Sequence, residues 1–232
     1  MNNTLFLVPN FIGDFSKALL SEHTLLQIYK LTHFIVERER TARAFLKAIK
    51  HPFAQDQFVF CELNKHDGYT GYKSFFNRHI GEYSIGLLSE AGLPAIADPG
   101  SEVVKYAHNE GINVKPLTGS SSIFLALMAS GMDGQHFEFS GYLPVESRER
   151  VKRLKELEQK SRKSTQIFME APYRNNQFLE LLIKNLLHTT TLCVAVDIEK
   201  SGKETIVSKR VKDWKIGELQ LHKKPCIYLI KR

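Results

Sequence analysis

The segment LLSEAGLPAIADPGSEVV, residues 87–104, has residue types that suit contact with a ligand through the main chain. Side chains are absent or very small at five of its positions: Ala91, Gly92, Ala95, Ala97 and Gly100. Such residues leave main-chain N–H and C=O groups accessible to a small polar ligand with a flat base. The segment also follows a predicted strand, and ligands bind beyond the carboxyl ends of strands in open α/β sheets. The alternative is a long turn, in which Asp98-Pro99-Gly100 leads into a helix.

A second segment, TGSSS at residues 118–122, follows another predicted strand and opens another predicted helix. Its hydroxyls and free N–H groups could hold a carboxylate at the helix N-terminus. Ordinary N-capping of the helix explains the same residues equally well.

Several motifs that define common enzyme classes do not occur in the sequence. It contains no GxxxxGK[ST] phosphate loop, no GxGxxG after the first strand, no HExxH and no GxSxG. These absences disfavour ordinary NTPases, Rossmann dehydrogenases, zinc proteases and α/β-hydrolases.

The three cysteines, Cys61, Cys193 and Cys226, are odd in number and far apart. They predict buried thiols in a reducing compartment, because they form neither a CxxC zinc pattern nor a disulfide framework. No apolar run approaches the ~18–20 residues that span a bilayer. The start, MNNTLFLVPN, lacks the basic region and long apolar stretch of a secretory signal. We therefore expect a cytoplasmic protein without a membrane segment or a metal site.

Strands and helices are predicted to alternate in the first half of the chain. Short apolar runs predict strands at 4–8, 33–37, 58–61, 85–88 and 113–117. Helices are expected between them, at 15–30, 39–50, 70–81 and 101–110, with Ser101 as a cap of the last. This alternation predicts an α/β domain, residues 1–116, with a largely parallel sheet.

The second half, residues 117–232, is predicted to form another α/β domain. Helices are expected at 120–131, 146–162 and 173–186, and strands at 137–142, 165–170, 191–198, 204–208 and 226–230. The late strands follow one another directly, so this sheet is predicted to be mixed.

Charge is distributed unequally between the two halves. Residues 1–116 contain 12 basic and 12 acidic residues, whereas the whole net charge of +7 lies in the second half. Residues 146–163 alone contain eight basic and four acidic residues. This asymmetry favours a polyanionic partner such as nucleic acid. The alternative is a solvated helix that turns Val151, Leu154 and Leu157 to the core.

Four segments, in order, resemble motifs of the small-subunit ribosomal RNA cytidine-2′-O-methyltransferases. Residues 87–104 resemble SDAGTPxISDPG, and VKPLTGSSSIFLALMASGM resembles PLPGPSAxxxALxxSGL. FEFSGYLP is similar to FxFxGFLP, and IFMEAPYR is similar to FYESPHR. Fainter similarity links LFLVPNFIGDF to LYVVATPIGNL and IVERERTARAFL to AAEDTRVTRRLL. These enzymes belong to the tetrapyrrole methylase superfamily, which uses S-adenosylmethionine.

The resemblance implies a two-domain α/β methyltransferase, usually a homodimer, with S-adenosylmethionine in a cleft between the domains. It implies cofactor contacts from Leu93, Pro94 and Ile96, which match a loop whose main chain faces the cofactor. Further contacts are implied at matching positions elsewhere: Pro9, Ser121, Ser122, Met169, Ala195, Pro225 and Cys226. The implied acceptor is a ribose 2′-hydroxyl of small-subunit ribosomal RNA.

A ribose hydroxyl is a poor nucleophile, so a base or a nearby cation would assist its attack. Glu37, Glu62, Glu90, Glu170 and Arg174 are therefore candidate catalytic residues near strand ends, and the sequence does not rank them. Each could equally form an ion pair or cap a helix. Arg174 is also the first candidate for contact with RNA phosphate or the cofactor, and Arg38 and Arg40 could hold RNA.

The sequence departs from the family pattern mainly in its first half. Asn10-Phe11 stands where the family has Thr-Pro, Glu90 replaces Asp, and Tyr173 replaces His. Two alternatives therefore remain open. One is a methyltransferase that acts on a tetrapyrrole or another small molecule, and the other is a non-catalytic RNA-binding protein of the same fold.

Overall fold

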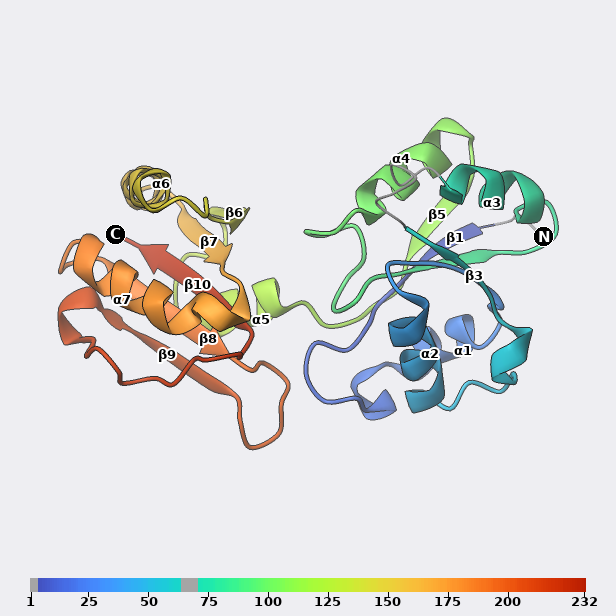
Figure 1. Cartoon of the computed structure of the whole chain (residues 1–232), viewed down its shortest axis with the longest axis horizontal. Helices are drawn as coiled ribbons and strands as arrows, with labels where there is room; N and C mark the ends of the chain where they lie inside the picture. The colour runs from blue at the N-terminus through green and yellow to red at the C-terminus, as the bar shows by residue number, and fades with distance from the viewer. Residues whose placement is uncertain (1–3, 64–70) are drawn as a thin grey trace. The chain divides into compact units, whose positions relative to one another are not determined.

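The computed structural model describes residues 4–63 and 71–232 (Figure 1). Residue contacts divide the chain into two compact units, Met1–Ser121 and Ser122–Arg232. The expected boundary after residue 116 lies earlier, at the end of a strand. The following segment stays with the first unit because Gly119 packs directly against Pro9 and the Thr24 hydroxyl donates to the Thr118 carbonyl.

The first unit contains a five-stranded parallel sheet in the order β3-β2-β4-β1-β5. Its strands are β1 (Thr4–Val8), β2 (His33–Val36), β3 (Val59–Glu62), β4 (Ile85–Leu88) and β5 (Asn113–Pro116). Its α-helices are α1 (Glu22–Ile28), α2 (Glu39–Ala48), α3 (Gly71–His79) and α4 (Gly100–Asn109). Strands β2 and β4 are buried along their whole length, which explains their continuous apolar sequences HFIV and IGLL.

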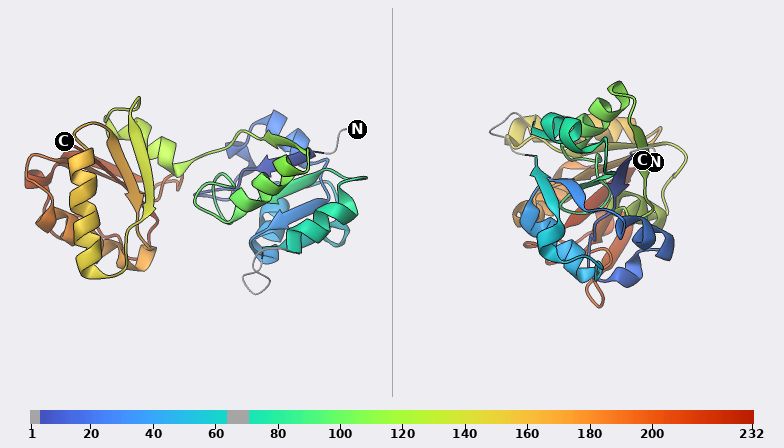
Figure 2. Two further views of the ribbon diagram at one scale, coloured as in Figure 1. Left: turned by 90° about the horizontal axis from the view of Figure 1, so that it is seen from above. Right: turned by 90° about the vertical axis from the view of Figure 1, so that its right-hand side faces the viewer.

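Helices cover both faces of this sheet (Figure 1, Figure 2). Phe34 and Val36 of β2 pack with Phe45 of α2 on one face. Ile35 of the same strand packs with Phe76 of α3 on the other face. The alternation of side chains along β2 thus places successive residues in two separate cores.

The neighbouring strands β1 and β4 form the switch point of the sheet. After β1 the chain passes through α1 to β2, whereas after β4 it passes through α4 to β5 on the other side. The two connections also lie on opposite faces, because α1 and α4 belong to different cores. Ligands bind at such a point in open α/β sheets, and the segment 89–99 leaves β4 there.

The second unit contains a mixed sheet in the order β6-β7-β10-β8-β9. Its strands are β6 (Phe137–Tyr142), β7 (Thr165–Met169), β8 (Thr191–Val196), β9 (Thr205–Arg210) and β10 (Cys226–Lys231). Only β6 and β7 pair in parallel, and the remaining pairs are antiparallel. The α-helices are α5 (Ser122–Ser130), α6 (Ser147–Lys160) and α7 (Asn175–Asn185). The predicted combination of a parallel and a mixed sheet is confirmed.

Helices α6 and α7 cover one face of the mixed sheet, where Leu154 and Phe178 pack with Phe168 and Tyr228. Helix α5 contacts strands β8, β9 and β10. Alternation along the strands therefore separates the residues that face α6 and α7 from those that face the opposite side.

Two local predictions differ from the structure. The helix expected over 15–30 begins only at Glu22, because Ser21 accepts a hydrogen bond from Thr24 N, and a separate 3₁₀ turn (Lys17–Leu19) precedes it. The expected cap Ser101 is wrong, since α4 begins at Gly100, whose N–H donates to the Asp98 side chain.

Cys193 and Cys226 are free and buried, as the sequence analysis predicted, whereas Cys61 is only half-buried. Burial raises the pKa of the Cys193 thiol to about 11 and that of Cys226 to about 12. We expect both thiols to resist iodoacetamide at pH 8 in the folded protein, because the thiolate is the reacting form. Mass spectrometry of native and urea-unfolded samples measures this, and rapid native labelling of Cys193 would contradict it.

No helix in residues 4–63 or 71–232 has the length and apolarity that a membrane crossing requires.

Candidate functional site

Asp98 braces the loop that follows β4. One carboxylate oxygen, Oδ1, accepts hydrogen bonds from Ala95 N at 3.0 Å and from Gly100 N at 2.7 Å. Between these bonds the main chain is strained, because Ala95 and Ala97 have φ values of 67° and 63°. This left-handed region costs an alanine roughly 1–2 kcal/mol. Strain of this kind clusters at ligand-binding sites, where the surrounding structure holds it in place.

The braced loop presents few side chains to solvent. Pro94 is buried and Leu93 is half-buried, whereas Ile96 is 42% exposed. Burial raises the pKa of Asp98, and its second oxygen, Oδ2, is buried without a hydrogen-bond partner. The predicted cofactor segment 93–96 therefore presents main chain and a few apolar side chains.

Asn10 joins the loop after β1 to the loop after β4. Its main-chain N–H donates to Gly92 O at 2.8 Å, and its Nδ2 donates to Ser89 O at 2.8 Å and Glu90 O at 3.1 Å. The side chain is buried, and its Oδ1 accepts from Phe11 N at 2.8 Å. Sequence reasoning recorded Asn10-Phe11 only as a departure from the family pattern. The sequence signal available for this role was a polar amide residue between two apolar residues, Pro9 and Phe11.

Glu37 and Glu90 come together at the carboxyl ends of β2 and β4. Glu37 Oε1 accepts from Glu90 N at 2.9 Å, and Glu90 Oε2 accepts from the Thr41 hydroxyl at 3.1 Å. Arg38 is 77% exposed and lies 3.9 Å from the same Glu90 oxygen. A half-buried carboxylate pair at this edge could hold a hydroxyl group, so Glu37 remains a candidate base.

Glu62, at the end of β3, has a structural contact. Its Oε1 accepts from Glu39 N at 2.5 Å, in the first turn of α2. A carboxylate at this place satisfies an orphan N–H and interacts favourably with the helix dipole. Glu62 is exposed, and Arg40 lies exposed on the same helix.

In the second unit, Met169, Ile227 and Ala195 form one row across β7, β10 and β8. Their neighbours along the strands, such as Phe168 and Val194, belong to the core under α6 and α7. The row therefore faces the opposite side of the sheet, the one that α5 contacts. Met169 and Ala195, predicted separately as adenosyl contacts, thus share one face, and Ser122 is the first residue of α5.

Cys226 does not share that face. Its side chain belongs to the core that contains Tyr228 and Val196. Pro225 is exposed, and its carbonyl accepts from Asp197 N at 3.1 Å. Any contact from Cys226 to a ligand on the α5 side would have to come from its main chain.

Glu170 follows Met169 directly, and its side chain is fully buried between two arginines. Arg174 donates from Nε at 3.0 Å and from Nη2 at 2.6 Å, both to Glu170 Oε1. Arg150 Nη1 lies 3.8 Å from the other oxygen, Oε2. The hydrogen bonds to Glu170 raise the pKa of Arg174, so the guanidinium stays charged. Arg174 is therefore positioned by Glu170 rather than solvated freely.

Half of the eight basic residues in segment 146–163 form ion pairs within the unit. Four of its basic residues, Arg150, Arg153, Lys155 and Lys160, lie within 4 Å of glutamate oxygens. Leu154 and Leu157 are fully buried, and Val151 is half-buried. These contacts favour the solvated-helix interpretation for the four paired residues.

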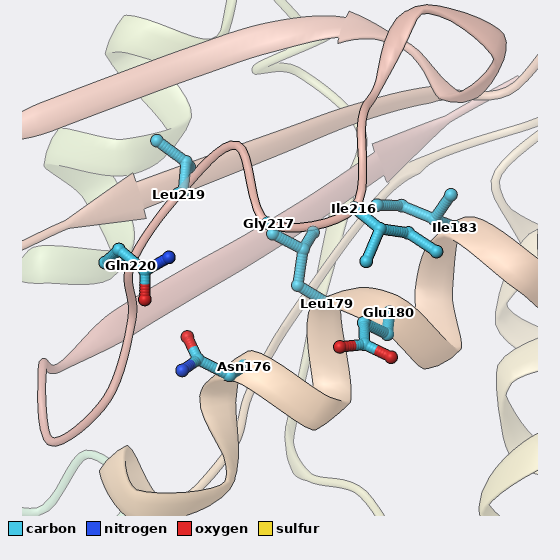
Figure 3. Close-up of a pocket in the computed structure, with 8 residues that line it drawn as sticks. All are labelled: Asn176, Leu179, Glu180, Ile183, Ile216, Gly217, Leu219 and Gln220. Carbon is cyan, nitrogen blue, oxygen red and sulfur yellow. The ribbon is translucent and has the colours of Figure 1, made fainter.

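A small cavity lies away from these residues, between α7 and the segment 216–220 (Figure 3). It has a volume of about 130 Å³ and is lined by Asn176, Leu179, Glu180, Ile183, Ile216, Gly217, Leu219 and Gln220. Sites for cofactor-sized ligands occupy about 300–1,000 Å³. None of the predicted site residues lines this cavity, and its size does not suit the expected cofactor.

We expect Asp98→Ala to weaken cofactor binding about tenfold and to lower the free energy of unfolding by about 1–3 kcal/mol. The substitution leaves Ala95 N without its acceptor and removes the bonds that offset the strained main chain. Calorimetric titration with S-adenosylmethionine and urea unfolding measure the two effects. Asp98→Asn keeps an acceptor oxygen and is the matched control. Equal cofactor affinity in wild type and Asp98→Ala would contradict the role of the brace.

No model of a known protein family matches the chain. The chain is 34% identical over 189 residues to "Ribosomal RNA small subunit methyltransferase I" of Halalkalibacterium halodurans, covering 81% of this chain and 62% of that protein. It is 29% identical over 230 residues to the protein of the same name from Pseudomonas aeruginosa, covering 98% and 78%. The identity is 32% over 197 residues to the Vibrio cholerae protein of that name, covering 85% and 65%. The chain thus spans less than two thirds of the first of these relatives.

Two solved structures of uroporphyrin-III C-methyltransferase from Thermus thermophilus have a similar fold. Their TM-scores are 0.58 and 0.60, each at 16% sequence identity, and each match covers 99% of this chain. The matches cover 98% and 94% of the solved chains. Together with the motifs and the two sheets, these similarities show that the chain has the tetrapyrrole methylase fold and is similar to proteins named "Ribosomal RNA small subunit methyltransferase I".

Proposed function

We propose that the chain is an S-adenosylmethionine-dependent methyltransferase that methylates a ribose 2′-hydroxyl in small-subunit ribosomal RNA. The observation that carries the cofactor assignment is the strained loop 93–98, which Asp98 braces at the switch point of a parallel sheet. The names of the relatives support ribosomal RNA as the acceptor.

The residues present fit this cofactor. The loop offers main-chain groups and one exposed apolar side chain, Ile96, where bulkier residues would fill the space. Leu93, Pro94 and Ile96 would hold the cofactor from the first unit, together with Pro9, Ser121 and the residues after it. Met169 and Ala195 would contact its adenosyl part through the face that they share. Further proposed contacts with the cofactor come from Ser122, Pro225 and Cys226.

Methyl transfer needs little covalent help from protein groups. S-adenosylmethionine supplies a methyl group on a positively charged sulfonium. The protein has to hold the acceptor oxygen in line, and proximity provides much of the rate. Ile96 and Met169 would present apolar contacts, which suit a positive charge that is lost in the transition state. Glu37 would accept the proton of the ribose hydroxyl, and Arg174 would contact RNA.

A transfer assay tests this proposal. Small ribosomal subunits and [methyl-³H]S-adenosylmethionine are incubated with the protein, and nuclease digestion then locates the label on a ribose. Label in a 2′-O-methylated nucleotide is expected. Cofactor binding without transfer to subunits would instead favour a small-molecule acceptor, and failure to bind the cofactor would favour a non-catalytic RNA-binding protein. Light scattering tests the homodimer that forms part of the proposal.

A further inference from the structure

Two segments of the second unit meet at the carboxyl ends of β6 and β7. The strands pair in parallel, and Tyr142, the last residue of β6, is in register with Met169, the last residue of β7. Chain segments that leave parallel neighbouring strands start at the same edge of the sheet. The surface formed by Tyr142, Val145, Tyr173 and Arg174 is called the rim below.

The rim has an internal scaffold of charged groups. Arg150 donates to Pro144 O at 2.7 Å and to Val145 O at 2.6 Å, and it approaches the buried Glu170. Glu170 in turn accepts two hydrogen bonds from Arg174. The segment after β6 is therefore connected to the segment after β7 through two guanidinium groups and one carboxylate.

Each of the two segments also has an exposed aromatic ring. Tyr142 is 59% exposed and Tyr173 is 63% exposed, and the Arg174 guanidinium carbon lies 5.1 Å from the centre of the Tyr173 ring. Isolated exposed apolar residues are ordinary on protein surfaces. Two exposed tyrosines on segments that start from one sheet edge, one of them beside an arginine held by Glu170, form a different arrangement.

Hydrogen-bonding capacity is also left over at the rim. Among the described residues, Arg174 Nη1 has no hydrogen-bond acceptor, although Nε and Nη2 bind Glu170. Glu146, at the start of α6, accepts from Glu149 N at 2.7 Å, and this hydrogen bond together with the charge of Arg150 lowers the pKa of Glu146. The free donor of Arg174 suits a phosphate oxygen.

We propose that the rim binds single-stranded RNA beside the methylated ribose. Tyr142 and Tyr173 stack on unpaired bases, and Arg174 contacts a phosphate. Aromatic stacking with a nearby cation is the common way in which proteins bind single strands without reading their sequence. The inference rests on the proposed function, because it extends the same site from Met169 towards the RNA.

The test uses the full chain and a single-stranded RNA of about 12 nucleotides, within the usual range of site sizes. Fluorescence anisotropy measures its binding to wild type, to Tyr142→Ala/Tyr173→Ala and to Tyr142→Phe/Tyr173→Phe. We expect the alanine pair to lower affinity at least tenfold and the phenylalanine pair to retain it, because phenylalanine keeps the stacking ring. Tyr83→Ala, which removes a 43% exposed tyrosine of the first unit, is the control and is expected to bind normally.

Further measurements separate this inference from the proposed function. In the transfer assay the alanine pair should raise KM for small subunits with little change in kcat, and cofactor affinity should stay at the wild-type value. If the alanine pair binds RNA as tightly as wild type, the proposed RNA contact at the rim is wrong. The proposed methyltransferase activity is not affected by that result. If the alanine pair changes the oligomeric state and leaves RNA affinity unchanged, the rim is a contact between protein chains. That result would also contradict the inference. Wild type that transfers no methyl group would overturn the proposed function, whatever the rim binds.

Discussion

Gly119→Ala is expected to lower the free energy of unfolding by about 3 kcal/mol, at the upper end of the usual cost of overpacking. A Cβ atom at this position would lie 2.1 Å from Pro9 Cβ and 2.6 Å from Pro9 Cγ. The proline ring cannot rotate away, so the main chain of one of the two segments has to move. Pro9 directly follows β1, and the segment after Gly119 leads to Ser121 and Ser122. The displacement should therefore also weaken cofactor binding.

Urea unfolding and calorimetric titration with S-adenosylmethionine measure these two effects of Gly119→Ala. Gly81→Ala is the matched control, because a Cβ atom at Gly81 would meet nothing within 4 Å. The same unfolding midpoint for both variants would show that Gly119 is not packed as described.

Glu170→Ala is expected to lower the free energy of unfolding by about 3–5 kcal/mol, the usual cost of removing one partner from a buried ion pair. The Glu170 side chain is fully buried, and the side chains of Arg150 and Arg174 are only 12% and 22% exposed. Their charges would then lie in a poorly solvated place without a counter-ion. Glu170→Gln keeps an acceptor oxygen for Arg174 and should cost less than the alanine variant.

Urea unfolding measures whether Glu170→Ala lowers the free energy of unfolding more than Glu170→Gln does. Glu180→Ala is the control, because Glu180 is 42% exposed and pairs with Lys184 one helical turn away. Exposed pairs of this kind contribute less than ~1 kcal/mol. Equal losses for Glu170→Ala and Glu180→Ala would mean that Glu170 does not hold the two arginines.

Local sequence patterns predicted most of the secondary structure. The ranges expected for β1, β4 and β6 agree with the structure, because each is a short run of strand-forming residues bounded by residues that turn the chain. The helix start at Gly100 was missed by one residue, although Asp98-Pro99-Gly100 contained the signal. The Asp side chain can accept from an N–H two residues later, and this bond replaces the expected cap at Ser101.

The candidate site was predictable only in part. Segments 93–96 and 121–122 were predicted as cofactor contacts because they follow strands and resemble family motifs, and their contact with a cofactor stays a prediction. Asn10 was missed as a site residue because its partners, Ser89 and Glu90, lie far along the chain. Glu62 and Glu90 looked alike in sequence, yet one contacts the first turn of α2 and the other contacts Glu37 and Thr41.

The sequence by itself determined the alternation of strands and helices, the two sheet types and the resemblance to family motifs, because these depend on residues that are close together in the chain. Only the tertiary structure decided the strand order β3-β2-β4-β1-β5 and the face on which each residue lies. Strand register places Met169 and Ala195 in one row and leaves Cys226 in the opposite core. The physical reason is that register and long-range hydrogen bonds join segments far apart in sequence, and their pairing depends on how the whole sheet packs.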